Sequence, residues 1–182
     1  MAITLVLGGA RSGKSAFAEQ LLAAVAQPVV YIATATAGDA EMAKRIAQHR
    51  ARRPAQWRSI EAPLDLAGAL QRHAAANTCV LVDCLTLWLS NLLFERGTDY
   101  PENGPIDPGP QFARRRDAVL DVLPQLPGQI VLVSNEIGFG VTPLGAVSRF
   151  FVDEAGRLNQ RVAALAQQVR LIVAGCPLAV KG

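Results

Sequence analysis

The chain has 182 residues, of which 51% are hydrophobic and only 18% are charged, and this composition can bury one sizeable core. Its net charge of +3 is small and its basic residues are scattered, which favours an anionic small-molecule ligand over nucleic acid or a membrane surface. No apolar run has the length of a membrane span and a strand is predicted at the N-terminus, so we expect a cytosolic protein without a signal peptide, folded as one domain over residues 1–182.

The first predicted element is a strand over residues 3–7, and the eight residues after it satisfy the phosphate-loop pattern G-x-x-x-x-G-K-[ST]. These residues are Gly8, Gly9, Ala10, Arg11, Ser12, Gly13, Lys14 and Ser15. In such a loop the backbone N–H groups turn inward around the phosphates of a nucleoside triphosphate, Lys14 neutralises the β and γ oxygens, and the Ser15 hydroxyl binds Mg²⁺. A helix predicted over residues 15–22 adds the positive end of its dipole. The alternative is a glycine turn that only joins a strand to a helix.

Apolar runs and helical patterns alternate along the rest of the chain. The runs at 29–33, 80–82, 130–133 and 171–174 are predicted to be fully buried strands, and residues 57–60 are a further strand candidate. Helices are predicted at about 41–53, 64–76, 85–95, 112–123 and 154–168. Because the apolar runs are continuous rather than alternating, we expect a doubly wound, P-loop NTPase-like α/β fold with a mostly parallel sheet and helices on both faces. The proline- and glycine-rich segment 97–110 is predicted to be a mobile surface loop.

In an open parallel sheet, ligands bind beyond the carboxyl ends of the strands, so polar residues at those ends are candidate site residues. Asp83 follows a buried strand and is the predicted Mg²⁺-side carboxylate; the alternative is an N-cap of the helix that begins near Leu85. Glu61 follows the strand candidate at 57–60. Glu136 precedes two glycines and is predicted either to lie at a ligand or to cap its own loop.

The predicted helix over residues 39–53 carries basic residues beside its apolar stripe. Arg45, His49 and Arg52 fall within roughly 60° of one another around the helix axis. Arginines disfavour the protonated form of a neighbouring histidine, and a neutral imidazole is a nucleophile. The alternatives are a solvated basic face and a nucleic-acid-binding helix.

The second histidine and the cysteines carry no comparable signal. His73 is predicted to be a surface residue. The chain has three cysteines, Cys79, Cys84 and Cys176, and no pair of them has C-x-x-C spacing. An odd number of cysteines without this spacing supports neither a disulfide framework nor a zinc site. Cys79 lies in an apolar strand and is predicted to be a buried thiol.

Residues that match one family pattern recur in order along nearly the whole chain. They are residues 7–15 and 31–34; 41–43, Arg45, Ile46, His49 and Arg50, with Arg53, Pro54 and Trp57; residues 83–93; residues 134–138 with Gly140, Val141 and Pro143; Arg149, Phe150, Asp153, residues 155–157, Asn159 and Gln160; and Gly175, Pro177, Leu178 and Lys181. In these residues the chain resembles the bifunctional adenosylcobinamide kinase / adenosylcobinamide-phosphate guanylyltransferase family of cobalamin biosynthesis. Only residues 97–110 show no recognisable pattern.

The resemblance implies one active site with two reactions. ATP or GTP phosphorylates the hydroxyl of the aminopropanol arm of adenosylcobinamide. GTP then guanylylates a helix histidine of the enzyme with loss of pyrophosphate, and the guanylyl group passes to adenosylcobinamide phosphate, which gives adenosylcobinamide-GDP. The family histidine corresponds to His49, and Lys14 is the second catalytic residue.

The resemblance also implies the nucleotide contacts and the assembly. The residues that correspond to the GTP contacts are Gly8 to Ser15, Ala33, Thr34, Ala35, Arg50, Ala51, Arg52, Arg53, Glu61 and Asp83. From the residues themselves, we expect Mg²⁺ to bind at the Ser15 hydroxyl and the Asp83 carboxylate. Relatives often carry Glu where Asp83 stands, and the shorter side chain keeps the charge. The family forms a homotrimer.

Three other functions use the same phosphate loop. A single-function small-molecule kinase would never hold a nucleotide covalently. A nucleic-acid-dependent ATPase would need the basic helix to bind polynucleotide, and a regulatory GTP-binding module would turn over slowly. The residues leave open which triphosphate the kinase step prefers and which base activates the acceptor hydroxyl.

Overall fold

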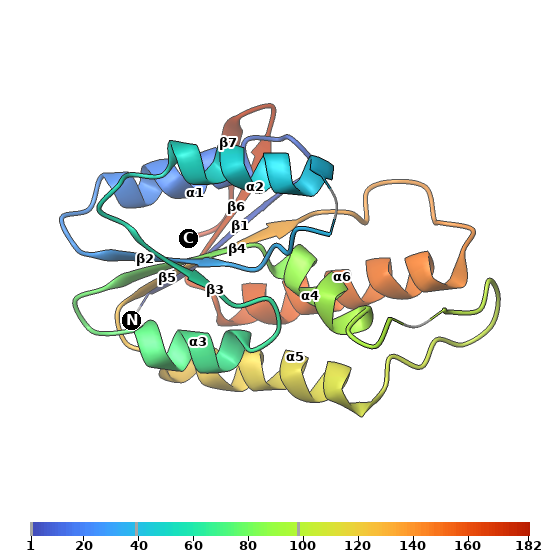
Figure 1. The fold of residues 1–182 in the computed structure, drawn as a ribbon. Helices are drawn as coiled ribbons and strands as arrows, with labels where there is room; N and C mark the ends of the chain where they lie inside the picture. The colour runs from blue at the N-terminus through green and yellow to red at the C-terminus, as the bar shows by residue number, and fades with distance from the viewer. Residues whose placement is uncertain (1, 39, 98) are drawn as a thin grey trace.

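The computed structural model describes residues 2–38, 40–97 and 99–182, without the side chains of Met42, Arg45, Gln48, His49 and Arg52. Its elements follow in the order β1 Ala2–Gly8, α1 Lys14–Ala23, β2 Val29–Ala33, α2 Ala40–Arg52, β3 Arg58–Glu61, α3 Leu66–His73, β4 Cys79–Asp83, α4 Leu85–Leu93, α5 Pro110–Val122, a 3₁₀ turn Leu123–Gln125, β5 Gln129–Asn135, α6 Ala146–Leu165, β6 Gln168–Val173 and β7 Cys176–Lys181. They form one α/β domain (Figure 1).

A single sheet of seven strands runs in the order β3-β2-β4-β5-β1-β6-β7. All neighbouring pairs are parallel except β6 and β7. The strands β2, β4 and β5 are apolar along almost their whole length and are buried, because helices cover the sheet on both faces. The predicted mostly parallel, doubly wound sheet is confirmed.

Two apolar layers hold the helices on the sheet. On one face, α1 contributes Ala18 and Leu22 to a core layer with side chains of β1, β2, β4 and β5. On the other face, α3, α4, α5 and α6 pack over a larger layer that includes the fully buried Trp88. Figure 1 shows α1 and α2 on one side of the sheet and the remaining helices on the opposite side. The carboxyl ends of the parallel strands therefore form one edge between the two helical layers.

The C-terminal part of the chain differs from the prediction. The expected strand 171–174 is not fully buried: β6 lies next to an exposed edge strand, and Val173 is 51% exposed. That edge strand, β7, turns back antiparallel to β6, and the sequence had not indicated it. The two turn residues Ala174 and Gly175 both have positive φ, 50° and 81°, which is the geometry of a two-residue hairpin turn. An alanine in this position is not a recognisable hairpin signal.

The last helix begins much earlier than predicted. The predicted start was residue 154, whereas α6 begins at Ala146. Phe150 and Phe151 in its first turns pack against the core, and this burial outweighs the low helix propensity of aromatic residues. Helix formation here follows tertiary packing rather than local sequence.

The described residues between α4 and α5, 94–97 and 99–109, form no helix or strand but are tied to the domain at several points. The Tyr100 hydroxyl donates to the carbonyl of Leu93 at 2.7 Å, and the Ala146 N–H donates to the carbonyl of Glu102 at 3.0 Å. Ile106 packs against the main core layer. The mobility expected for 97–110 stays a prediction. Within the part of the chain that the structure describes, no helix has the length and apolar character of a membrane span.

Candidate active site

The phosphate loop lies between the end of β1 and the start of α1, at the carboxyl edge of the sheet. Gly13 adopts φ 97° as it enters α1, and a side chain on Gly8 would place Cβ only 2.8 Å from the carbonyl oxygen of Ile172. The loop conformation therefore requires glycine at both positions. Because α1 begins at Lys14, the N-terminal end of this helix, with its positive dipole end, faces the loop. This arrangement can bind phosphate groups.

Lys14 is folded over the loop rather than extended into solvent. Its side chain is only 9% exposed, and Nζ donates to the carbonyl oxygen of Gly9 at 3.1 Å. The Ser12 hydroxyl is buried and has no hydrogen-bond partner among the described residues. A buried polar atom without a partner is costly, so a ligand phosphate would satisfy a group that the protein leaves open.

Asp83 ends β4, and its carboxylate is held by a tyrosine of the neighbouring strand. The Tyr31 hydroxyl donates to Asp83 Oδ2 at 2.8 Å. Burial raises the pKa of Tyr31 far above its ordinary value and the Asp83 charge raises it further, so the phenol remains a donor. The structure does not support the alternative that Asp83 is the N-cap of α4. The N-cap of α4 is Cys84, whose Sγ accepts from the N–H of Leu87 at 3.4 Å.

Thr34 belongs to the support of the site rather than to its surface. Its hydroxyl donates to the carbonyl of Cys84 at 2.7 Å and accepts from the Cys84 N–H at 2.8 Å. Its own carbonyl accepts from Nδ2 of Asn91 at 2.7 Å. The residue is 0% exposed, and its contact with the nucleotide stays a prediction. It fixes the segment after β2 against the segment after β4.

The C-terminal end of α2 is bound to the same edge of the sheet by two arginines. Arg50 forms an ion pair with Glu61, the last residue of β3. The guanidinium of Arg53 stacks on the ring of Tyr31, with Cζ 3.4 Å from the ring centroid, and Nη1 donates to the Ser59 hydroxyl at 3.4 Å. Tyr31 therefore contacts both the Asp83 carboxylate and the end of α2.

The predicted nucleophile lies on this helix. His49 is one residue from Arg50 in the last turns of α2, and the backbone of the helix is described. The side chains of His49, Arg45 and Arg52 lie outside the described part of the structure. His73, in contrast, is at the end of α3 and is half-buried rather than a plain surface residue. Burial, Arg58 and Arg72 lower its pKa.

Two backbone hydrogen bonds from distant segments support the phosphate loop, and only one of these segments was indicated by the sequence. The N–H of Gly175, in the β6–β7 turn, donates to the carbonyl of Ser12 at 2.8 Å. The N–H of Glu136 donates to the carbonyl of Gly8 at 3.1 Å, while its carboxylate accepts from the Gly138 N–H at 2.7 Å, which is the loop-cap alternative. The glycines of 138–140 pointed to this loop, whereas no local signal pointed to Gly175.

A buried hydroxyl pair supports the end of β5 beside the loop. The hydroxyls of Thr86 and Ser134 lie 3.2 Å apart, and the Asn135 N–H donates to Thr86 Oγ1 at 2.7 Å. Asn135 is paired with Gly8 in the parallel register of β5 and β1. The network therefore orients α4 and β5 against the strand that leads into the phosphate loop.

The three cysteines are free thiols in the described structure. Cys79 is buried, as predicted, and Cys176 is exposed. Burial raises the pKa of the Cys84 thiol to about 11, so this residue caps α4 in its neutral form. The site therefore contains an anionic carboxylate at Asp83 but no thiolate beside it.

Comparisons with known proteins show the family to which the chain belongs. The family described as cobinamide kinase / cobinamide phosphate guanyltransferase (CobU) matches residues 4–180. The bifunctional adenosylcobalamin biosynthesis protein CobP of Pseudomonas aeruginosa is 54% identical over 98% of this chain and 96% of its own length. The bifunctional protein CobU of Escherichia coli K12 is 40% identical over 97% and 98%.

Solved structures with the same fold are distant in sequence. The type III secretion ATPase EscN of enteropathogenic E. coli, in complex with EscO, has a TM-score of 0.57 at 10% identity, over 93% of this chain and 41% of EscN. The PH0250 protein of Pyrococcus horikoshii OT3 has a TM-score of 0.54 at 10% identity, over 100% and 86%. These two likenesses concern the fold alone. By the match over residues 4–180 and the two bifunctional relatives, the chain is a transferase that belongs to the cobinamide kinase / cobinamide phosphate guanyltransferase family.

Proposed function

We propose that this protein phosphorylates adenosylcobinamide with ATP or GTP and then transfers GMP from GTP to adenosylcobinamide phosphate, which gives adenosylcobinamide-GDP. Family membership supports both activities. The observation that supports a single active site for both reactions is the series of contacts Asp83–Tyr31–Arg53. These contacts join the carboxylate at the end of β4 to the end of the histidine-bearing helix α2.

In the kinase step, the hydroxyl of the aminopropanol arm attacks the γ-phosphorus. A new O–P bond forms, the bond between the γ-phosphorus and the β–γ bridging oxygen breaks, and the nucleoside diphosphate leaves while the hydroxyl proton is lost to solvent or a base. Lys14 and the N-terminal N–H groups of α1 neutralise the charge that develops on the phosphates.

The donor set suits Mg²⁺. This ion usually keeps several waters and binds one or two protein oxygens together with substrate phosphates, and here one carboxylate, Asp83, and one hydroxyl, Ser15, are the candidate ligands. Among the described residues, no group of three or more His, Cys, Asp and Glu side chains is placed to hold a metal ion. When bound, the ion would neutralise phosphate charge. Tyr31 holds the Asp83 carboxylate in one orientation for it.

In the transfer step, a ring nitrogen of His49 attacks the α-phosphorus of GTP. An N–P bond forms and pyrophosphate leaves. A phosphate oxygen of adenosylcobinamide phosphate then attacks the same phosphorus, the N–P bond breaks and the histidine is regenerated. We propose that Arg50, Arg52 and Arg53 hold the anionic phosphates during both displacements.

The remaining contacts and the assembly are part of the same proposal. We assign the nucleotide to Gly8–Ser15, with Ala33, Ala35, Ala51, Glu61 and Asp83 beside it and Thr34 acting through the backbone that it holds in place. We also propose a homotrimer. Analytical ultracentrifugation tests the trimer, and a monomer at assay concentrations would contradict it.

The sharpest test of the proposed function uses GTP labelled at the α-phosphate. The native protein should retain the label after denaturation, as a phosphoramidate that is labile in acid and stable in base. His49→Ala should form no adduct and no adenosylcobinamide-GDP but keep part of its kinase activity, because that step needs no enzyme nucleophile. His73→Ala is the matched control and should label normally. An adduct that survives in His49→Ala would overturn the assignment, and an unlabelled but kinase-active native protein would indicate a single-function kinase.

A further inference from the structure

A cleft of about 550 Å³ lies beside the phosphate loop and contains none of the residues assigned to the nucleotide. Its walls are residues of the loop between β5 and α6, within 137–143, and residues of α6 from Arg149 to Gln160. Ligand sites typically fall in this range of volumes. We propose that this cleft binds the corrinoid acceptor, adenosylcobinamide and then its phosphate; the proposal rests on the function proposed above.

The position of the cleft fits an acceptor that must reach the γ-phosphate. Asn135 is paired with Gly8, and Gly138, which lines the cleft, follows three residues later. The Glu136 N–H donates to the Gly8 carbonyl at 3.1 Å, and the two residues from Glu136 to Gly138 span at most about 7 Å, so the cleft begins within about 10 Å of Gly8. The aminopropanol arm of a corrinoid bound there would extend toward the phosphates.

The chemistry of the lining suits an amphipathic, amide-bearing molecule rather than a polyphosphate. A corrinoid has a broad apolar macrocycle and a rim of primary amides. Ile137, Val141 and Val152 supply apolar contacts, while Asp153 and Gln160 supply hydrogen-bond acceptors and donors at the rim. Asp153 is exposed and forms no ion pair or side-chain hydrogen bond within the part of the chain that is described, so its carboxylate is free to accept from amide N–H groups.

The loop that borders the cleft presents large apolar side chains to solvent. Phe139, Val141 and Leu144 are 82%, 96% and 93% exposed. Such a group of side chains on a surface indicates a binding partner. A macrocycle that projects from the cleft would cover them, and a second copy of this chain is the competing occupant.

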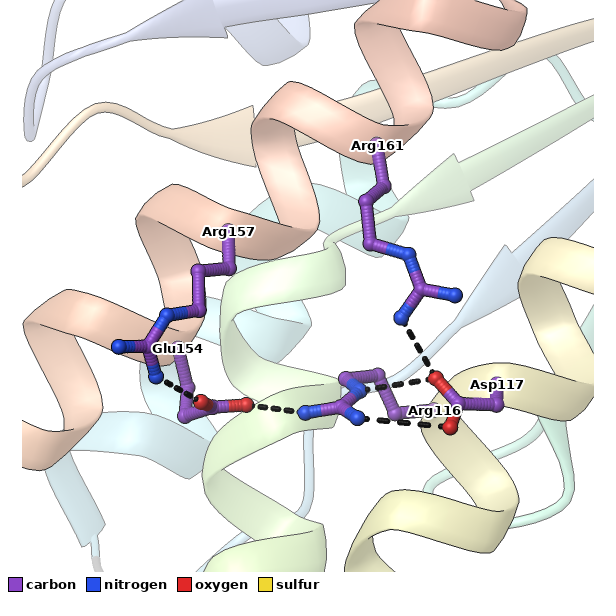
Figure 2. Close-up of polar contacts among 5 residues, drawn as sticks. All are labelled: Arg116, Asp117, Glu154, Arg157 and Arg161. Atoms are coloured by element: carbon purple, nitrogen blue, oxygen red, sulfur yellow. Dashed lines mark hydrogen bonds and ion pairs between the residues drawn. The ribbon is translucent and has the colours of Figure 1, made fainter.

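Both walls of the cleft are held in place without a ligand. Arg149 lines the cleft and donates to the carbonyls of Pro143, at 3.2 Å, and Leu144, so it ties the loop to α6. Arg157 pairs with Glu154, which also pairs with Arg116 of α5 (Figure 2). These contacts form a preorganised site, which lowers the cost of binding.

A larger side chain at Gly156 would fill the cleft without disturbing the core. Gly156 lines the cleft on α6, and a Cβ built there meets nothing within 4 Å. Gly156→Phe therefore adds volume in the cleft without a clash in the core, and removes a poor helix former. Gly156→Ala is the size control, and Ala164→Phe, at an exposed position further along α6, is the control for an added aromatic ring.

We expect Gly156→Phe to raise the KM for adenosylcobinamide by at least about tenfold in the kinase assay and to weaken adenosylcobinamide binding in equilibrium dialysis to a similar extent. Labelling of the protein by α-labelled GTP in the absence of corrinoid should be unchanged. Gly156→Ala, which adds only one methyl group, should raise this KM far less than Gly156→Phe does, and Ala164→Phe should behave as the native protein does. If circular dichroism shows that Gly156→Phe does not fold, Asp153→Ala is the second test variant. The Asp153 side chain is exposed and unpaired among the described residues, so its loss should not disturb folding. Asp153→Ala should raise the KM for adenosylcobinamide severalfold with kcat unchanged.

An unchanged KM and unchanged dialysis binding would overturn the cleft assignment while leaving the proposed function intact. An altered sedimentation coefficient of Gly156→Phe would also overturn it, because the cleft would then be a contact between subunits. A native protein that neither binds nor phosphorylates adenosylcobinamide would instead refute the proposed function itself.

Discussion

Replacing Tyr31 by phenylalanine removes one oxygen atom and one hydrogen bond from the centre of the site. The ring remains beneath the guanidinium of Arg53, so the end of α2 keeps its contact with β2. The carboxylate of Asp83 loses a donor at 2.8 Å. A hydrogen bond to a charged group contributes about 1.5–3 kcal/mol, and the half-exposed position of Asp83 favours the lower end, near 1.5 kcal/mol. We therefore expect about a tenfold loss in kcat/KM for phosphoryl transfer.

The assay is a titration of both reactions with Mg²⁺. If Tyr31 orients the carboxylate for the metal, Tyr31→Phe should need more Mg²⁺ for half-maximal rate while its labelling at saturating Mg²⁺ is nearly restored. Arg53→Lys is the matched variant, because it keeps the charge and the Tyr31–Asp83 bond but loses the flat stacking surface. It should impair guanylyl transfer with little change in the Mg²⁺ requirement. An unaltered Mg²⁺ requirement in Tyr31→Phe would refute the reasoning.

The same variant has a stability signature at alkaline pH. Burial and Asp83 hold the pKa of Tyr31 above its ordinary value near 10, so the folded protein keeps this proton while the unfolded chain releases it. Above about pH 10 the unfolded state binds fewer protons than the folded state, so stability falls by about 1.4 kcal/mol per pH unit from this residue. Urea unfolding at about pH 9 and about pH 11 should show a smaller loss in Tyr31→Phe than in the native protein. If the native protein and Tyr31→Phe lose the same amount of stability, the inference that the Tyr31 phenol is buried and protonated is wrong.

Other predictions concern the loop, the metal and the α5–α6 ion pairs. Lys14→Ala should fold normally yet lose about 10² to 10³ in the rate of both reactions, measured by product formation, and full retention of guanylyl transfer would indicate a second nucleotide site. EDTA should abolish both reactions, and Asp83→Ala should raise the Mg²⁺ concentration that each requires. Hydrogen bonds from Arg116 and Arg161 lower the pKa of Asp117 (Figure 2), so its stabilising effect is present above pH 4 or so and is lost as pH falls below that range. The stability of Asp117→Asn should therefore fall less steeply with decreasing pH than that of the native protein, as measured by acid unfolding. An identical acid transition in the two proteins would exclude this contribution of Asp117.

The sequence predicted best where a short segment carries its own structural signal. The phosphate loop was predicted residue by residue, because the glycines, the lysine and the serine act at fixed local spacing. The apolar strands of the sheet centre were predicted because a fully buried strand needs apolar residues on both faces. The start of α6 and the existence of β7 were not predicted. Aromatic packing stabilises the first turns of α6, and an Ala174-Gly175 turn stabilises β7, and neither is a strong local signal.

The candidate site was predicted in its residue types but not in its arrangement. Asp83 was identified from its place after a strand, whereas Tyr31, part of an apolar run and of the family pattern, was given no role in the site. Their bond joins residues 52 positions apart, and it exists because β2 and β4 are neighbours in the sheet. The support of Ser12 by Gly175 depends in the same way on the pairing of β1 with β6.

The linear order of residues determined the class of chemistry: a phosphate loop between a strand and a helix, a carboxylate at a strand end and a histidine on a basic helix. Local spacing suffices for this because backbone conformation and charge within a few residues depend on those residues themselves. Only the tertiary structure decided which groups meet. The strand order β3-β2-β4-β5-β1-β6-β7 brings Tyr31 to Asp83 and Gly175 to the phosphate loop, and the packing of α6 opens the cleft beside the β5–α6 loop. Contacts between distant segments depend on how buried faces pair, and no local pattern specifies that pairing.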